Sequence, residues 1–379
     1  MQLHARIAAP ASAVWRYLTD PALHNQWSLA TMRILSLGDQ DVADGIGAYR
    51  SITVKAPTGP VRMFEVIEHA EPPARLVYRV TRGPQLLRKH RGEIRLVEEG
   101  GVTALAWRVE LEFAVPGVAA LSERLLEDQV GRSLRALERV ADGAPAAELV
   151  MPRAYRDEPI EPLLAATGPI LAEQRALADE LEAAHDPKAW FARVYQYVTE
   201  GQLAAIASGA VTHREWALRL IPRFHHYYTR NLAAWRSGRP GETESPWALA
   251  FGFAESTGDR PAGERVVGAL LLGVRAHIDE DLPRALAEVY LDHFAERCDY
   301  ARFRADYLLM APIFRGAADR LLGELPASAI PLSIRVAKRL LPPEVQDALT
   351  NRRGYDVPVQ RLEAFERGDR LARWAASRR

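Results

Sequence analysis

The sequence lacks the features that mark secreted, membrane-spanning and nucleic-acid-binding proteins. Cys298 is the only cysteine among 379 residues, which excludes an internal disulfide and a CxxC metal site. Apolar runs such as Val266–Val274 are far shorter than the roughly 20 residues that cross a bilayer. The 49 basic and 49 acidic residues balance, whereas binding to nucleic acid needs a basic excess. Lysine is scarce beside arginine, which is typical of GC-rich bacterial genomes.

The first ten residues, Met1–Pro10, show no basic segment followed by an apolar one. A secretory leader would have that pattern. We therefore expect a cytoplasmic protein with no transmembrane segment and no nucleic-acid partner.

Two kinds of periodicity meet near residue 150. Up to about Gly143, polar and apolar residues alternate, most clearly over Arg62–His69 and Ala104–Val115. Alternation of this kind is typical of half-buried antiparallel strands. Gly100-Gly101 lies between two alternating runs and predicts a hairpin. Apolar residues at helical spacing precede and follow the strands, over residues 10–18 and 118–141.

The opening segment 5–27, ARIAAPASAVWRYLTDPALHNQW, has a strand ending in Pro10, then Val14-Trp15, a Thr19-Asp20-Pro21 turn and Trp27. Pro72–Leu76 follows a later strand that ends at Glu71. In these features the first part of the chain resembles the START-like, or SRPBCC, superfamily of polyketide cyclases and lipid-transfer proteins. The resemblance implies an α+β helix-grip fold, in which a curved antiparallel sheet wraps around a C-terminal helix over an apolar cavity.

The rest of the chain shows helical periodicity alone. Residues 144–159 contain Pro145, Pro152, Pro159 and a charged run, as a linker would. Further on, Phe224–Trp235 is aromatic-rich, and Ala276-His277-Ile278 is followed by Asp281-Leu282. This part resembles the family called domain of unknown function 5995. We expect a START-like domain over 1–143, a linker over 144–159 and an all-helical domain over 160–379.

Large aromatic residues on the predicted strands, and one near the expected cavity mouth, are candidates for ligand binding. They are Trp27, Tyr49, Phe64, Tyr78, His90 and Trp107. A pocket for a flat hydrophobic ligand needs apolar walls with a few polar groups. The alternative is that each aromatic residue fills the core, where such residues are common. Cyclases of the superfamily place polar side chains inside, and Arg79, Arg108 and His90 are the best suited here, although the sequence does not fix which face of the sheet they occupy.

A second group of candidates lies in the helical part. His277 and Asp281 are four residues apart and share one face of a helix. They are candidate catalytic residues together with Tyr228, and candidate ligands of a divalent metal together with His225. The alternative is structural: Asp281 caps the helix that contains Pro283, or a buried His277 pairs with Asp281.

Three functions remain open from the sequence. The first is binding, with or without cyclisation or another acid–base conversion, of a hydrophobic small molecule such as a polyketide or lipid in the N-terminal cavity. The second is a metal-dependent or hydrolase-type enzyme centred on His277 and Asp281. The third is a ligand sensor whose helical domain is an interaction module. P-loop, GxGxxG and GxSxG motifs are all missing, so no standard motif decides among them.

Overall fold

The computed structural model describes residues 1–56, 59–84, 86–114, 116–256, 262–325 and 357–378. They fall into two units. The first unit is Met1–Tyr155 with Arg297–Ala305, and the second is Arg156–Glu296 with Asp306–Arg379. The first contains an antiparallel sheet with helices, and the described residues of the second form helices without strands. These architectures confirm the predicted fold classes.

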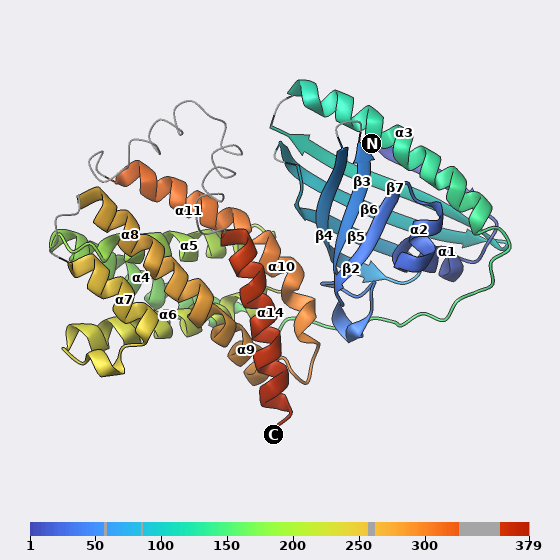
Figure 1. Ribbon diagram of the computed structural model, residues 1–379. Helices are drawn as coiled ribbons and strands as arrows, with labels where there is room; N and C mark the ends of the chain where they lie inside the picture. The colour runs from blue at the N-terminus through green and yellow to red at the C-terminus, as the bar shows by residue number, and fades with distance from the viewer. Residues whose placement is uncertain (57–58, 85, 115, 257–261, 326–356, 379) are drawn as a thin grey trace. The chain divides into compact units, whose positions relative to one another are not determined.

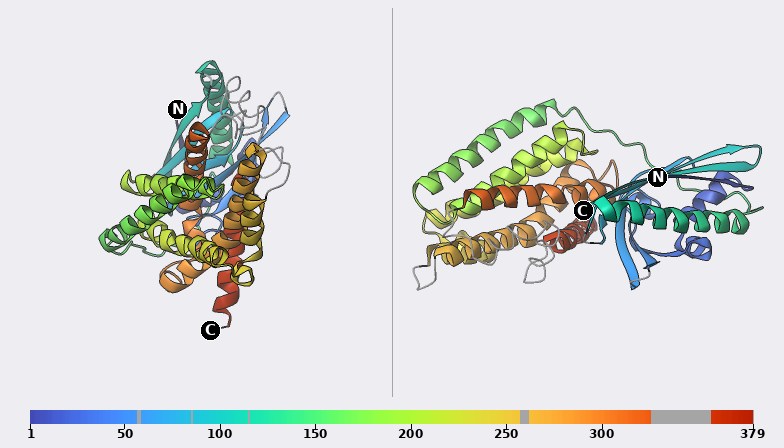
Figure 2. Two further views of the ribbon diagram at one scale, coloured as in Figure 1. Left: turned by 90° about the vertical axis from the view of Figure 1, so that its left-hand side faces the viewer. Right: turned by 90° about the horizontal axis from the view of Figure 1, so that it is seen from above.

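The first unit is built on one antiparallel sheet of seven strands in the order β1-β7-β6-β5-β4-β3-β2. The strands are β1 (Gln2–Ile7), β2 (Ala30–Ser36), β3 (Tyr49–Ala56), β4 (Gly59–Glu71), β5 (Arg75–Arg82), β6 (Leu87–Glu99) and β7 (Val102–Phe113). The helices are α1 (Ala11–Thr19), α2 (Pro21–Trp27) and α3 (Pro116–Val140). α3 runs along one face of the sheet, against β1 and β7 (Figures 1 and 2).

The core of this unit forms where one face of the sheet meets the helices. Successive side chains on a strand point to opposite faces, so Ile7 of β1 and Leu105 of β7 reach the same core. Trp15 of α1 and Leu134 and Leu137 of α3 pack with them. Burying each such side chain contributes about 1.5–3 kcal/mol, so this contact holds α3 against the sheet.

The hairpin predicted from two adjacent glycines joins β6 and β7. Gly100 and Gly101 have φ angles of 61° and 79°, and the strands pair directly on either side of them. Two consecutive residues with positive φ match the twist of antiparallel strands and favour glycine. The turn therefore sets the register of the two long strands.

The segment Arg297–Ala305 belongs to the first unit, although its sequence predicted a place in the helical domain. Arg302 donates from Nη1 to Oδ2 of Asp39, and both side chains are buried. Arg304 donates from Nη1 to the carbonyl oxygens of Leu37 and Gly47 at 2.9 and 2.6 Å. Periodicity does not reveal these bonds, because the residues that they join lie far apart in the sequence.

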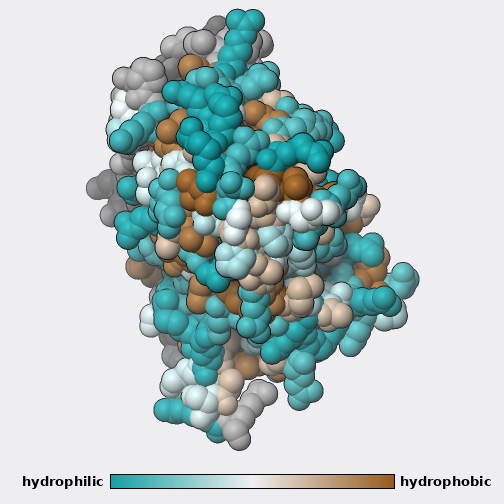
Figure 3. Space-filling model, turned by 90° about the vertical axis from the view of Figure 1, so that its right-hand side faces the viewer, coloured by the Kyte–Doolittle hydropathy of each residue, from teal (hydrophilic) through white to brown (hydrophobic). Residues whose placement is uncertain are grey.

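The second unit is a set of helices. They are α4 (Glu161–Ala183), α5 (Ala189–Ala207), α6 (Arg214–Arg236), α7 (Ser245–Glu255), α8 (Ala262–Arg275), α9 (Leu282–His293), α11 (Ala311–Glu324) and α14 (Val357–Ala376), with most of α10 (Arg304–Leu309). Phe191, Tyr228, Trp247 and Phe251 form the centre of a core shared by α5, α6 and α7. None of the helices described is both long and apolar enough to cross a membrane. Figure 3 views the molecule from the side that is at the right of Figure 1, and on this face hydrophobic side chains are interspersed with hydrophilic ones.

A π-helical turn, Ala276–Asp281, separates α8 from α9. The N–H of Leu282 donates to the carbonyl of His277, five residues earlier. Pro283 explains the wider turn, since in a regular helix its ring would clash with the carbonyl of Asp279 and its nitrogen has no hydrogen to donate. The turn places His277 and Asp281 on one face.

The Asp39–Arg302 pair gives a stability prediction. Arg302→Ala leaves the buried carboxylate of Asp39 without its cation and should lower the free energy of unfolding by about 3 kcal/mol. Arg33→Ala, which removes an exposed arginine of β2, is the matched control and should change it by less than about 0.5 kcal/mol. Equal denaturation midpoints for the two variants would show that the Arg302 bond contributes nothing.

Candidate functional site

A cavity of about 90 Å³ lies inside the first unit. Its apolar wall includes Met32, Ile52, Val54, Met63, Ile94 and Val109 of the sheet and Leu126 and Val130 of α3. Leu29 also lines it and is 48% exposed, so the cavity reaches the surface near the end of α2. The register of the sheet therefore produces an apolar pocket with an outlet.

A buried ion pair lies in the wall of this pocket. Nε of Arg50 donates to Oε1 of Glu65, and the two residues are 3% and 4% exposed. They are direct partners across β3 and β4. The Arg50 guanidinium carbon lies 5.4 Å from the centre of the Tyr78 ring, close enough for a cation–π contact. Nη1 of Arg50 is buried and has no hydrogen-bond partner among the described residues.

The aromatic side of the pocket continues from this pair. Trp107 donates from Nε1 to the hydroxyl of Tyr78 at 3.1 Å, and the Tyr78 and His90 rings meet edge to face with centroids 6.0 Å apart. Nδ1 of His90 is buried and has no partner in the described part of the chain. The pocket thus presents two unused polar groups, from Arg50 and His90, within apolar walls.

Burial determines the charges of the lining residues. It lowers the pKa of His90 to about 4. Burial and the positive charge of Arg50 lower the pKa of His24, which also lines the pocket, to about 4. Both imidazoles are therefore neutral at pH 7. Burial raises the pKa of Glu65, and the adjacent Arg50 opposes this shift.

The structure places four of the predicted ligand-binding residues in the lining of this pocket: Trp27, Tyr78, His90 and Trp107. Tyr49 and Phe64 do not reach it. Their neighbours Arg50 and Glu65 do, and successive strand residues point to opposite faces. Tyr49 and Phe64 instead stack on each other, with ring centroids 6.1 Å apart.

Arg50 and Glu65, the polar centre of the pocket, were not predicted from the sequence. A signal was present, because Arg50 alternates in phase with Ile52 and Val54, which places a charge on an apolar face. Of the polar residues favoured instead, His90 lines the pocket, whereas Arg79 and Arg108 do not. Arg79 pairs with Glu68, and the side chain of Arg108 is 64% exposed.

Gly92 of β6 leaves room for the ring of Tyr78. A Cβ atom at Gly92 would lie 2.2 Å from the Tyr78 ring, well inside van der Waals contact. The two residues are direct partners across β5 and β6. Glycine at this position therefore lets the tyrosine ring lie flat over the neighbouring strand, between Arg50 and His90.

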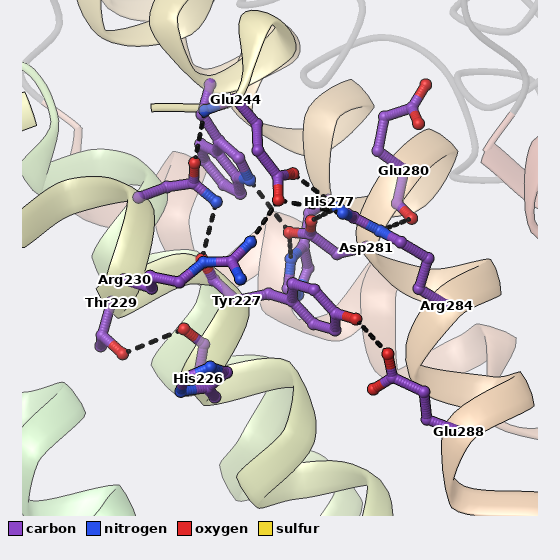
Figure 4. A network of polar contacts seen from close by, with 12 residues as sticks. His226, Tyr227, Thr229, Arg230, Glu244, His277, Glu280, Asp281, Arg284 and Glu288 are labelled. Carbon is purple, nitrogen blue, oxygen red and sulfur yellow. Dashed lines mark hydrogen bonds and ion pairs between the residues drawn. The ribbon is translucent and has the colours of Figure 1, made fainter. Parts of the chain in front are cut away.

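The second unit contains the other predicted site (Figure 4). His277 lies with Nδ1 3.0 Å from Oδ2 of Asp281, as its spacing predicted. The same oxygen accepts from Nε1 of Trp247 at 3.0 Å, and Oδ1 accepts from Nη2 of Arg284 at 2.8 Å. Asp281 is fully buried, so its carboxylate is surrounded by donors.

These donors do not suit a divalent metal at Asp281. The Arg284 guanidinium occupies the side of the carboxylate where a cation would bind, and it also donates to both oxygens of Glu244, at 2.9 and 2.6 Å. No group of three or more His, Cys, Asp or Glu side chains converges among the residues that the structure describes. The residues present therefore do not fit the metal considered from the sequence.

The remaining candidates of this unit lie apart from the pair. Both ring nitrogens of His225 are buried, with Nε2 3.1 Å from Glu173 but without hydrogen-bond geometry. Tyr228 packs on Phe191 and Trp247, with ring centroids 5.0 and 5.2 Å away. The rings in direct contact with His277 are Phe224, Tyr195, Phe191 and Trp247. Tyr228 and His225 thus belong to the surrounding core.

The sheet and α3, with the pocket between them, have the helix-grip arrangement expected from the sequence. Residues 1–142 match the family described as polyketide cyclase / dehydrase and lipid transport. Residues 168–352 match a family of unknown function, DUF5995. Both resemblances inferred from the sequence are thus confirmed.

Solved structures similar to this chain cover 37–39% of it. The protein TTHA0849 from Thermus thermophilus is 19% identical and matches 37% of this chain and 95% of its own, with a TM-score of 0.32. A START superfamily protein from Mycobacterium smegmatis is 15% identical over 37% of this chain and 95% of its own, also with a TM-score of 0.32. No curated protein gave a match.

Proposed function

We propose that the first unit binds a compact, mainly hydrophobic small molecule in the pocket between its sheet and α3. The observation that supports this is the combination of apolar walls with two buried polar groups, of Arg50 and His90, that have no partner in the described residues. Buried polar groups are normally paired, because an unpaired one costs about 1–3 kcal/mol. A bound molecule would supply the missing partners.

The size of the pocket favours a compact ligand over a long lipid. Its volume is about 90 Å³, whereas an engineered apolar cavity of about 150 Å³ holds benzene. A ligand would therefore place one small group inside and extend through the opening near Leu29. Trp27 and Trp107 would contact the inserted group, as the sequence analysis predicted.

The same pocket contains groups that can transfer a proton. His90 is neutral at pH 7, because burial lowers its pKa to about 4, so it has one nitrogen that accepts and one that donates. Glu65 has a raised pKa through burial. Acid–base conversion of a ligand would use these two side chains, with Arg50 and Tyr78 orienting the ligand.

A pair of substitutions on neighbouring residues tests the location of binding. Ile52→Phe enlarges a pocket-lining side chain and should weaken binding of ethylbenzene, an apolar probe, at least tenfold by occupying its space. Thr53→Phe makes a similar enlargement on the opposite face of β3 and should leave the affinity unchanged. The indole N–H signals of Trp27 and Trp107 in NMR titrations report binding. Failure of the wild-type protein to bind, or equal loss in both variants, would contradict the proposal.

A second candidate function is favoured by the free nitrogen of His277. Nδ1 faces Asp281, so it carries the proton and leaves a lone pair on Nε2. Nε2 has no partner in the described residues, and it is not among the fully buried atoms. The side chain of His277 is 13% exposed. The lone pair on Nε2, on a ring whose Nδ1 is oriented by Asp281, supports an acid–base role for His277.

Chemical labelling and stability together test this candidate. Diethyl pyrocarbonate, which acylates neutral imidazole nitrogens, should modify His277 faster than His225, whose nitrogens are buried. His277→Gln should lower the free energy of unfolding by less than about 1 kcal/mol, because Asp281 keeps two other donors. His225→Gln serves as the control. A loss above about 3 kcal/mol in His277→Gln with no acylation of the wild-type residue would assign His277 to the core alone.

A further inference from the structure

We propose that the pocket of the first unit takes an uncharged ligand with a carbonyl oxygen, which accepts a hydrogen bond from Nη1 of Arg50, and that it rejects carboxylates. This inference rests on the function proposed above, because it concerns the same pocket. It adds the chemical class of the ligand, and it follows from the charges and unpaired atoms of the lining.

The unpaired guanidinium nitrogen requires an acceptor. Arg50 is 3% exposed and lines the pocket, and its Nη1 has no partner in the described chain. A guanidinium carries donors only. The group that completes its hydrogen bonding is therefore an oxygen or nitrogen with a lone pair. A carbonyl oxygen is the simplest acceptor that adds no charge and little volume.

The charge balance of the lining excludes an anion. The charged residues of the lining are Arg50 and Glu65, which form a pair. The lining imidazoles, His24 and His90, are neutral at pH 7 because burial lowers the pKa of each to about 4. The positive charge of Arg50 is thus already compensated. A ligand carboxylate would be a second buried anion beside Glu65 with no second cation, an arrangement that desolvation and repulsion both disfavour.

His90 extends the site to a second polar group on the ligand. Its Nδ1 is buried and unpaired among the described residues of the same wall, and its ring meets Tyr78, over which Arg50 lies. A neutral imidazole donates from one nitrogen and accepts at the other. The site therefore suits a carbonyl compound with a hydroxyl or second carbonyl group nearby.

Three probes of similar shape test the charge rule in the full chain at pH 7. They are acetophenone, which has a carbonyl, ethylbenzene, which has none, and benzoate, which is an anion. Acetophenone should bind at least as tightly as ethylbenzene, although its transfer from water to an apolar site is less favourable. It should bind at least tenfold more tightly than benzoate. Benzoate binding as tightly as acetophenone, or ethylbenzene binding tenfold more tightly, would overturn the inference. Binding of none of them would contradict the proposed function itself.

Removing the negative charge from the pair should change the selectivity. Glu65→Gln keeps the shape and an acceptor for Nε of Arg50 but leaves the guanidinium charge uncompensated. Benzoate should then bind at least tenfold more tightly than to the wild-type protein and should overtake acetophenone. Glu112→Gln makes the same change in net charge at an exposed position of β7 and should leave all affinities unchanged. Unaltered benzoate affinity in Glu65→Gln would show that Glu65 does not set the selectivity.

Discussion

The buried ion pair between Arg50 and Glu65 is the interaction on which the pocket of the first unit depends. Two charges removed from water are tolerated only when they are paired and hydrogen-bonded, and the direct partnership of β3 and β4 brings these two together. Tyr78 can lie beside Arg50 because Gly92 has no side chain. One nitrogen of the guanidinium has no partner among the described residues, so Arg50 can donate a hydrogen bond to a polar group of a bound molecule.

The sequence predicted much of the first unit, because its signals are local. Alternation indicated the strands, and adjacent glycines indicated the hairpin, which has the positive φ angles that such a turn requires. The face on which each aromatic residue lies depends on the phase of the pleat. Trp107 and Tyr78 therefore reach the pocket, whereas Tyr49 and Phe64 lie behind it. Arg302 escaped prediction because its partner, Asp39, is distant in the chain.

The helical unit shows the same limit. Spacing of four residues predicted the contact between His277 and Asp281, and the contact forms even though the turn is π-helical. The role of Asp281 was harder to foresee, because Trp247 is distant from it in the sequence but binds its carboxylate in the structure, as Arg284 also does. These two side chains leave no position for a metal ion. A histidine near acidic residues suggests a metal site from the sequence. In the structure, however, an arginine, Arg284, binds the carboxylate of Asp281.

A crystal structure of the full chain with acetophenone tests most directly whether Arg50 donates a hydrogen bond to a ligand carbonyl. We expect the carbonyl oxygen about 2.7–3.2 Å from Nη1 of Arg50, the phenyl ring directed toward the opening near Leu29, and the Arg50–Glu65 pair intact. A pocket that stays empty at saturating acetophenone, or a carbonyl oxygen that points away from Arg50, would contradict it.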